Sequence, residues 1–459
     1  MTCTLVLPHW LAEDIEKAAQ DPLETAGVLL ASMCNLADGT RKLLARRIHW
    51  VPPEAYRHRS GNALLIGSDG YVPALQEAET IGACAIWFHT HPSHIGIPLP
   101  SSHDDRVDEQ LSDLFRLRTG AEVYGSLIVS PGRGGFTFSG FIEGDRWRAE
   151  IDRLIVVGDR LRFAKTFRAG CDEVSPEFDR SVRAFGGAVQ ASLGELRFGI
   201  VGNGGTGSAV TEQLVRLGAR KLALFDPDTL TTSNLTRVYG SRRTDVGRPK
   251  PEILRDHLLA IAPDLSCETH NQSILEEAVA RQLASCDVVF GCTDDNAGRL
   301  VLSRLASYFL IPVFDCGVLL SSDASGQLTG IDGRVTTLCP GTSCLVCRDR
   351  VDLRRAAAEQ MSAAEHGRLA AEGYAPSLGR VEPAVVTFTT MVAAAAVSEL
   401  IERLVGYGPT PRPSEVLLRA HDRETSTNIV PPRDGHYCDP AAGKLGTGTL
   451  EPFLEQAWR

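Results

Sequence analysis

The chain has 459 residues, of which 43% are hydrophobic and 23% are charged. This balance is that of an ordinary globular protein, and the length suffices for two or three domains with separate cores. The net charge of −10 comes from 47 basic and 57 acidic residues without long runs of one sign. We therefore expect neither nucleic acid nor a membrane surface as a partner.

Twelve cysteines lie at irregular spacings, which indicates buried thiols and metal ligands in a reducing compartment rather than a disulfide framework. The first ten residues, MTCTLVLPHW, carry no basic leader and no long apolar segment, so we expect no signal peptide and a cytoplasmic location. The apolar stretch 384–397 runs into Glu399 and Glu402, which is typical of a core helix and not of a membrane span.

Residues 1–155 are predicted to form a mixed α/β domain. A helix is expected over 8–19, followed by an apolar strand that contains Glu24 in ETAGVLLAS. A second apolar strand, 83–88, leads into the tetrapeptide HTHP, and the sequence SSHDD from Ser101 opens a helix of about a dozen residues.

His89 and His91 stand two positions apart at the end of the second strand, so their side chains share one face and can bind one metal ion. Asp104 on the following helix can supply a third ligand and leave the fourth position to water, as in catalytic zinc sites. Two histidines alone more often lie in a surface turn. Pro92, the PSxxD helix start and the earlier Glu24 favour the metal site.

Together these motifs resemble the JAMM (MPN-type) metalloproteases over about the first 150 residues. The resemblance implies a zinc isopeptidase with ligands His89, His91 and Asp104, Glu24 as general base and Ser101 as oxyanion donor. The loop from Pro92 to Ser101 is longer than usual in the family, which leaves Ser102 with Asp105 as a second register. Pro100, directly before Ser101, favours the first register.

A linker is predicted at 156–178, with Gly170 and Pro176 in a charged stretch. The segment SPEFDRSVRAFGGAVQASL is expected to open the second domain, 179–430, with an N-capped helix.

The order of elements from 197 to 226 is a strand, a glycine turn, a helix and a second strand. The apolar run 198–201 leads into Gly202, Gly204 and Gly207, and the run 221–225 ends in Asp226. This unit places phosphates at a helix N-terminus and an acidic side chain near the ribose. The glycine motif alone fits an NAD or FAD site equally well.

Further polar residues favour a different cofactor. Arg237 and Lys250 can neutralise charge that develops on phosphates, and Asp294 follows the apolar strand 288–290, where it can hold Mg²⁺. Hydride transfer has no use for these groups, whereas chemistry that splits a nucleoside triphosphate needs them.

In this order the motifs resemble the ubiquitin-activating enzymes and the ThiF/MoeB-like adenylyltransferases, from about residue 179 to 406. The resemblance implies a Rossmann-like doubly wound domain that uses ATP and Mg²⁺. By resemblance, Asp226 binds ribose, Asn234, Arg237 and Lys250 contact phosphates, and Asp294 binds magnesium. Arg180, in FDRSVRAFG, would reach into the partner subunit's ATP site, which implies a homodimer.

The pair Cys344 and Cys347 is a CxxC motif, and the resemblance implies half of a structural zinc site there. The second CxxC that the family normally has is replaced by His436 and Cys438 in the tail, 431–459. The alternative is a degenerate pair of reduced thiols, and Cys339 is a spare ligand candidate.

The segment 351–380 corresponds to the family's crossover loop, where many members carry a cysteine that forms a thioester. This chain has none there. Either Cys316 or Cys438 substitutes, or the adenylate passes directly to a conjugating enzyme or a sulfur donor.

The two halves together predict a bifunctional enzyme of a bacterial ubiquitin-like system. One half would adenylate a C-terminal glycine, and the other would cleave an amide at the same tail. The alternative is the activation and processing of a sulfur-carrier protein for a thiolated cofactor or amino acid. A third hypothesis is a silent scaffold or an NAD enzyme.

Overall fold

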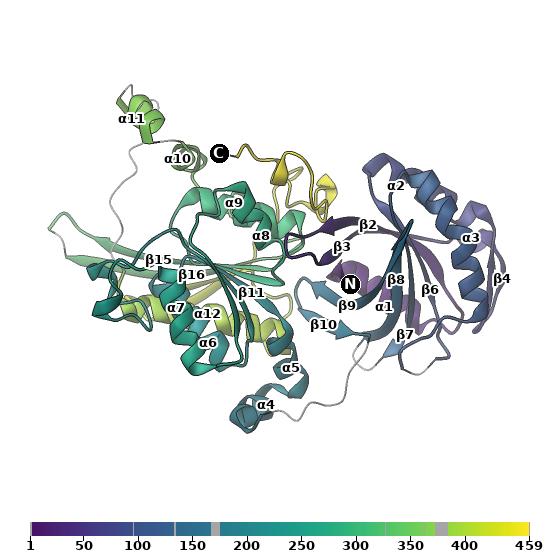
Figure 1. Ribbon diagram of the computed structural model, residues 1–459, viewed down its shortest axis with the longest axis horizontal. Helices are drawn as coiled ribbons and strands as arrows, with labels where there is room; N and C mark the ends of the chain where they lie inside the picture. Colours follow the sequence, from purple (N-terminus) through teal and green to yellow (C-terminus); the bar gives the residue numbers. More distant parts are fainter. Residues whose placement is uncertain are drawn as a thin grey trace. The chain divides into compact units, whose positions relative to one another are not determined.

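The computed structural model describes residues 2–94, 96–132, 135–166, 175–325, 327–361, 363–371 and 384–458. The chain divides into two compact units (Figure 1). The first comprises Met1–Cys171 with Gly446–Thr449, and the second comprises Asp172–Leu445 with Leu450–Arg459. Each unit has a sheet of its own.

The sheet of the first unit closes on itself. Its strands follow the order β1-β3-β2-β6-β7-β8-β9-β10, and β9 also pairs in parallel with β1. A separate hairpin is formed by β4 and β5. The strands are β1 (Thr2–Pro8), β2 (Ala26–Asn35), β3 (Arg41–Trp50), β4 (Tyr56–Arg59), β5 (Leu64–Ile66), β6 (Cys84–Thr90), β7 (Tyr124–Gly132), β8 (Gly135–Gly144), β9 (Trp147–Val157) and β10 (Arg162–Lys165).

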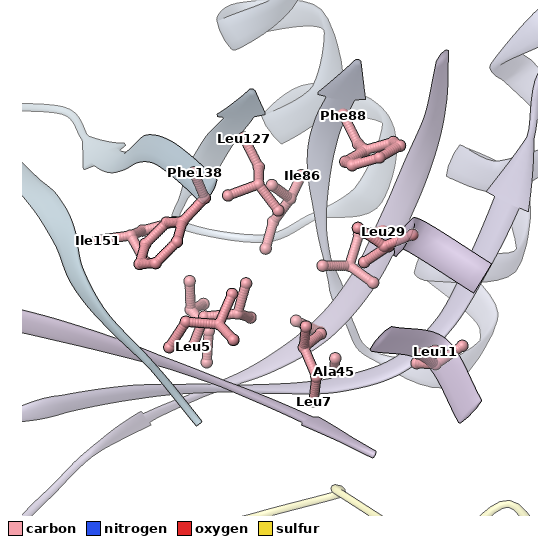
Figure 2. Close-up of a cluster of buried hydrophobic side chains, with 14 of the residues drawn as sticks. Leu5, Leu7, Leu11, Leu29, Ala45, Ile86, Phe88, Leu127, Phe138 and Ile151 are labelled. Carbon is pink, nitrogen blue, oxygen red and sulfur yellow. The ribbon is translucent and has the colours of Figure 1, made fainter. Parts of the chain in front are cut away.

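Both faces of this sheet are covered, which explains why β2, β6 and β7 are almost continuously buried. Helix α1 (His9–Gln20) packs against one face of the sheet, and the core between them includes Leu5, Leu127 and Phe138 (Figure 2). Helices α2 (Val72–Ile81) and α3 (Ser102–Thr119) lie against the other face, around Trp87 and Phe115.

Helix α1 confirms the helix predicted over 8–19 to within one residue. The prediction for Glu24 was wrong, because β2 begins at Ala26 and Glu24 lies in the preceding loop. There its N–H donates to the carbonyl of Ser60 at 2.8 Å and its carbonyl accepts from Arg59 at 2.7 Å, so its backbone bonds outside the sheet. Helix α3 has 18 residues, longer than expected, and ends where Gly120 adopts φ +68°.

The predicted linker also differs from the structure. Residues 156–165 include the end of β9 and all of β10, which pairs antiparallel with β9. Residues 167–174 of that linker lie outside the described residues. The single N-capped helix is instead two helices, α4 (Asp179–Phe185) and α5 (Gly187–Glu195), separated at Gly186 with φ +87°. Neither helix has a side-chain cap.

The second unit contains a mixed sheet in the order β13-β12-β11-β14-β15-β16-β17-β18. The strands from β13 to β15 are parallel and the later pairings are antiparallel. Chain order reverses between β11 and β14, and such a switch point is where open α/β sheets bind ligands. The strands are β11 (Arg197–Val201), β12 (Lys221–Phe225), β13 (Ser266–His270), β14 (Val288–Gly291), β15 (Val313–Ser322), β16 (Leu328–Leu338), β17 (Glu415–Arg419) and β18 (Glu424–Asn428).

Helices cover both faces of this sheet, as expected for a doubly wound domain. In Figure 1, α6, α7 and α12 lie on one face and α8 and α9 on the other. The helices are α6 (Gly205–Arg216), α7 (Lys250–Ile261), α8 (Glu277–Leu283), α9 (Asn296–Tyr308), α10 (Leu353–Glu359), α11 (Ala363–Ala371) and α12 (Val386–Val405).

The apolar stretch 384–397 forms most of α12, whose buried residues include Val392 and Leu400, so the prediction of a core helix is confirmed. Within the described ranges, no helix is long and apolar enough to cross a membrane. Much of the predicted tail packs on the second unit, where Phe453 contacts Phe309 ring to ring and Arg304 donates to the carbonyl of Leu454 at 2.6 Å.

Candidate active sites and metal centres

The glycine turn after β11 is shaped by two close approaches. Gly202 has φ +84°, and a Cβ placed there would lie 2.6 Å from the carbonyl oxygen of Cys292. A Cβ at Gly207 would lie 1.8 Å from the carbonyl oxygen of Gly202. Gly204 precedes the first turn of α6, and among the described residues nothing lies within 4 Å of a Cβ placed there. Space is therefore open beside Gly204 at the start of α6, the end of a helix at which unpaired N–H groups can bind a phosphate.

Asp226 and Lys250 meet at the carboxyl end of β12. Asp226 is 5% exposed and accepts the N–H groups of Asn203 at 2.7 Å and Asp228 at 2.9 Å. Burial raises the pKa of Asp226, and the nearby charge of Lys250 opposes that shift. The Nζ atom of Lys250 lies 2.7 Å from Asp228 and 3.7 Å from Asp226. The lysine is thus held by carboxylates beside the expected ribose site.

Arg237 lies beside the start of α6, because its Cβ and Cδ are 3.3 Å from a Cβ placed at Gly205. Its guanidinium donates to the carbonyl of Ser233 at 3.0 Å. Asn234 is buried, and its side-chain oxygen accepts the N–H of Thr231 at 3.0 Å. Asn234 therefore has a local capping role whether or not it contacts a phosphate.

Two adjacent carboxylates follow β14. Asp295 caps α9 by accepting the N–H of Gly298, and it also accepts the hydroxyl of Thr293. Asp294 is exposed. Because Asp295 is engaged in capping, Asp294 is the carboxylate of the pair that a Mg²⁺ ion could use, and its assignment as the magnesium ligand stays a prediction.

Arg180 is exposed on α4. In the part of the chain that the structure describes, no hydrogen bond or ion pair links it to the residues above. Asn203 was missed in the sequence analysis although it is fully buried and its N–H binds Asp226. It is the second residue of the glycine motif, a position at which the motif specifies no side chain, so the sequence contained no signal for it.

The predicted metal ligands of the first unit converge. The Nε2 atoms of His89 and His91 are 3.1 Å apart, and carboxylate oxygens of Asp104 lie 3.3 Å from His89 and 3.6 Å from His91. Ligands of a tetrahedral zinc ion with bonds near 2.05 Å are separated by about 3.4 Å. The three residues therefore fit zinc, and the geometry selects Asp104 rather than Asp105.

Ser101 and Asp104 form a capping box at the start of α3. The Ser101 hydroxyl oxygen accepts the N–H groups of His103 and Asp104 at 3.2 Å, and Asp104 accepts the N–H of Ser101 at 2.6 Å. Burial raises the pKa of Asp104, but hydrogen bonds from His89 and His91 outweigh it and hold that pKa well below its usual range. The carboxylate is therefore ionised, as a metal ligand must be.

Glu24 lines the same cleft, whose volume is about 610 Å³, together with His89, His91, Ser101 and Asp104. Glu24 is 6% exposed. Burial raises its pKa, and the two histidines oppose the shift. A carboxylate whose pKa is moved toward neutrality is a better general base than an ordinary one.

The second predicted metal cluster is also assembled. Cys344 Sγ lies 3.6 Å from His436 Nδ1, Cys347 Sγ lies 3.6 Å from Cys438 Sγ, and His436 Nδ1 lies 3.3 Å from Cys438 Sγ. The cysteines are buried, and all four ligand atoms lie within 4.8 Å of one another. A hydrogen bond with Cys438 lowers the pKa of Cys344 to about 5. Three sulfurs and one nitrogen at these distances fit a closed zinc site.

Two cysteines had been considered as substitutes for the missing crossover cysteine. Cys316 is 4% exposed, and hydrogen bonding with Cys292 together with burial raises its pKa far above the usual value. Cys438 belongs to the metal cluster, whereas Cys339 does not. The burial of Cys316 and the place of Cys438 in the cluster of metal-ligand residues therefore disfavour a thioester at either cysteine. Residues 372–380 of the crossover segment lie outside the described residues.

Comparison with known proteins identifies relatives that match part of this chain. Molybdopterin-synthase adenylyltransferase of Escherichia coli K12 is 30% identical over 184 residues, which is 39% of this chain and 70% of that protein. Ubiquitin-like modifier-activating enzyme 5 of Dictyostelium discoideum is 30% identical over 161 residues, which is 32% of this chain and 40% of that protein. The crystal structure of E. coli MccB with ATP aligns with 16% identity and a TM-score of 0.44 over 58% of this chain and 75% of MccB.

The model of the ThiF family matches residues 178–438. This match lies within the second unit and spans the glycine turn, Asp294 and the four residues of the cysteine cluster. Since it covers more than half of the chain, this protein belongs to the ThiF family.

Proposed function

We propose that the second unit adenylates the C-terminal glycine of a ubiquitin-like or sulfur-carrier protein with ATP and Mg²⁺. The observation that carries this proposal is that Arg237 lies beside the start of α6 while Asp226, paired with Lys250, binds the N–H of Asn203 in the glycine turn, at the switch point of the sheet. Membership of the ThiF family and the named activities of the two relatives support it.

Each residue has a separate task in this reaction. The N–H groups of α6 bind phosphate oxygens, and Asp226 accepts a ribose hydroxyl. Arg237 and Lys250 neutralise the charge that grows on the leaving pyrophosphate, for which Lys250 must exchange its contact with Asp228 for one with phosphate. Mg²⁺, when bound at Asp294, supplies further charge neutralisation. Arg180 would complete the site of a partner subunit in a homodimer.

For the first unit we propose cleavage of an amide at a glycine-ending protein tail, in maturation or deconjugation. The support is the geometry of His89, His91 and Asp104 beside Glu24 in one cleft. Zinc, when bound there, would activate a water molecule. Glu24 takes the proton and later delivers it to the leaving amine. The Ser101 hydroxyl oxygen accepts backbone N–H groups, so its own hydrogen remains able to bind the oxyanion.

We propose a structural role for the cysteine cluster, in which Cys344, Cys347, His436 and Cys438 hold a second zinc ion. The ligands come from two segments about 90 residues apart, so a bound metal would tie the tail to the end of β16.

The adenylated tail has two possible fates, which belong to two different biological systems. In a bacterial ubiquitin-like system the activated tail reaches a conjugating enzyme or target lysines. In sulfur-carrier chemistry the tail becomes a thiocarboxylate. A cleft able to reverse a conjugate favours the first setting. Mass spectrometry of the recovered partner distinguishes them, since a thiocarboxylate would identify the second.

The first experiment is ATP–pyrophosphate exchange with glycine-terminated ubiquitin-like and sulfur-carrier proteins, comparing the wild type with Asp294→Ala. We expect exchange that depends on the protein substrate and disappears in the variant. Exchange that persists in Asp294→Ala would contradict the assigned role of Asp294. No exchange with any such protein would favour the hypothesis of a silent scaffold.

A further inference from the structure

A fully buried carboxylate in the second unit is shared by two arginines to which the sequence analysis assigned no role. Asp315 on β15 has 0% exposure. Its carboxylate lies 2.6 Å from a guanidinium nitrogen of Arg334 on β16 and 3.4 Å from Nε of Arg299 on α9. The side chain of Arg334 is 15% exposed and that of Arg299 is 16% exposed.

This arrangement leaves excess positive charge. Two guanidinium groups meet one carboxylate, and the neighbouring Glu415 is itself shared by Arg348 and Arg350. Within the described part of the chain, the Nε atoms of Arg299 and Arg334 and the Oδ1 atom of Asp315 have no hydrogen-bond partner of good geometry. The two guanidinium groups carry one more charge than the single carboxylate balances, and buried donors are normally satisfied, so this cluster has capacity for a further anionic acceptor.

The cluster lies near the end of β14, where the reaction is proposed to occur. Asp315 stands opposite Gly291, three residues before Asp294, and Arg299 lies in the first turns of α9. A Cβ placed at Gly291 would be 3.6 Å from Asp315 Oδ1 and would meet Leu302 of α9. The Asp315 side chain therefore lies on the face of the sheet that α9 covers.

Arg334 lies on the same face. Its neighbour Gly333 faces the other way, toward Val392 of α12, because alternate strand residues point to opposite faces. Arg334 is paired with Gly317, and a Cβ at Gly317 would lie 3.3 Å from the guanidinium. The absence of a side chain at Gly317 therefore lets the Arg334 guanidinium lie across β15 toward Asp315.

We propose that Arg299 and Arg334 bind the C-terminal carboxylate of the protein substrate before adenylation, with Asp315 holding both guanidinium groups in place. This inference rests on the proposed function. A carboxylate oxygen then attacks the α-phosphorus of ATP, which forms the acyl phosphate bond and breaks the bond to the pyrophosphate leaving group. Arginine suits this task because its fork of donors matches a planar carboxylate.

The test measures the effect of each variant on the KM for the protein substrate and on the KM for ATP separately. In ATP–pyrophosphate exchange, Arg334→Gln and Arg299→Gln should each raise KM for the glycine-terminated protein about tenfold or more, because each loses a charged hydrogen bond. The KM for ATP should stay within about twofold, since the arginines do not bind phosphate in this proposal. Arg334→Lys should recover part of the loss.

Arg350→Gln is the matched control, because it also removes an arginine from a shared carboxylate, Glu415, in the same sheet. Its KM values should both stay near wild type. Equal increases in KM for ATP and for the protein in Arg334→Gln would assign the arginines to phosphate and overturn the proposal. Unchanged KM values with a lower melting temperature would reduce the cluster to a structural ion pair, which also overturns it.

A second measurement does not depend on turnover. The full-length protein without ATP should bind a synthetic peptide ending in Gly-Gly carboxylate more tightly than the same peptide ending in a carboxamide. Arg334→Gln should lose that preference. If wild-type exchange is absent but the preference is found, the proposed adenylation fails and the carboxylate site stands. If the wild type shows no preference, the carboxylate site itself is excluded.

Discussion

The two metal-ligand clusters of this chain differ in donor type and in access to solvent. His89, His91 and Asp104 offer two nitrogens and an oxygen, and they line a cleft of about 610 Å³. The cysteine cluster around Cys344 offers three sulfurs and a nitrogen, and its cysteines are buried. Open sites with three protein ligands are typical of catalytic zinc, whereas closed sites with four are typical of structural zinc. From this difference we expect that ligand substitutions and chelators affect activity and stability differently at the two sites.

The largest effect is expected for His89→Ala. Loss of one nitrogen ligand from the open site should reduce peptidase activity to background and remove one of the two expected zinc ions. Pyrophosphate exchange should be retained, because the second unit has its own sheet and site. Metal analysis together with both activity assays checks this. A parallel loss of both activities would contradict the independence of the two units.

Glu24→Gln should lower peptidase turnover by about 10²–10⁴, the range for loss of a general base, while the zinc content stays unchanged. The amide matches the shape of the carboxylate but cannot take a proton from water. This variant therefore distinguishes two possible roles of Glu24 in the open site, general base and metal ligand. A fall in zinc content in Glu24→Gln would show that the residue binds the metal.

Ser101→Ala should lower peptidase turnover by about 10²–10³ through loss of the oxyanion donor, and should cost about 1 kcal/mol of stability through loss of the helix cap. Ser102→Ala is the matched control, because Ser102 lies one residue into α3 and is exposed. Steady-state kinetics and thermal unfolding of both variants test the register. The opposite ranking of the two serines would assign the site to Ser102.

Cys347→Ser should leave peptidase activity intact and destabilise the second unit. Serine is a poor zinc ligand, so the bridge between β16 and the tail would weaken, which should appear as a melting temperature lower by several degrees. A chelator should remove the zinc of the open cleft faster than that of the buried cluster. Equal rates of removal would show that burial does not protect the second site.

The local patterns were the most predictable part of the structure. The strand, glycine turn and helix that contain Gly202 and Gly207 follow from residues adjacent in sequence, and so do the paired positions of His89 and His91. In each case short-range geometry fixes the residues, which is why the glycine turn and the close approach of His89 and His91 could be anticipated from sequence.

The missed features depend on contacts between distant residues. Glu24 lies outside β2 because its backbone bonds to residues near Ser60, and the pairing of Asp315 with Arg334 depends on strand register. The end of the first unit was placed too early because β10 pairs back on β9. Periodicity within one segment contains no information about such pairings.

The capping box at the start of α3 ties helix formation to metal binding. One oxygen of Asp104 accepts the Ser101 N–H while the other faces His89. Folding of the helix therefore preorients the ligand, and a bound ion would in turn stabilise the first helical turn. Replacement of Asp104 by histidine to change the metal preference would remove the carboxylate half of the capping box, while the Ser101 hydroxyl would still accept backbone N–H groups. Any redesign of this centre therefore has to replace the bond to the Ser101 N–H along with the metal ligand.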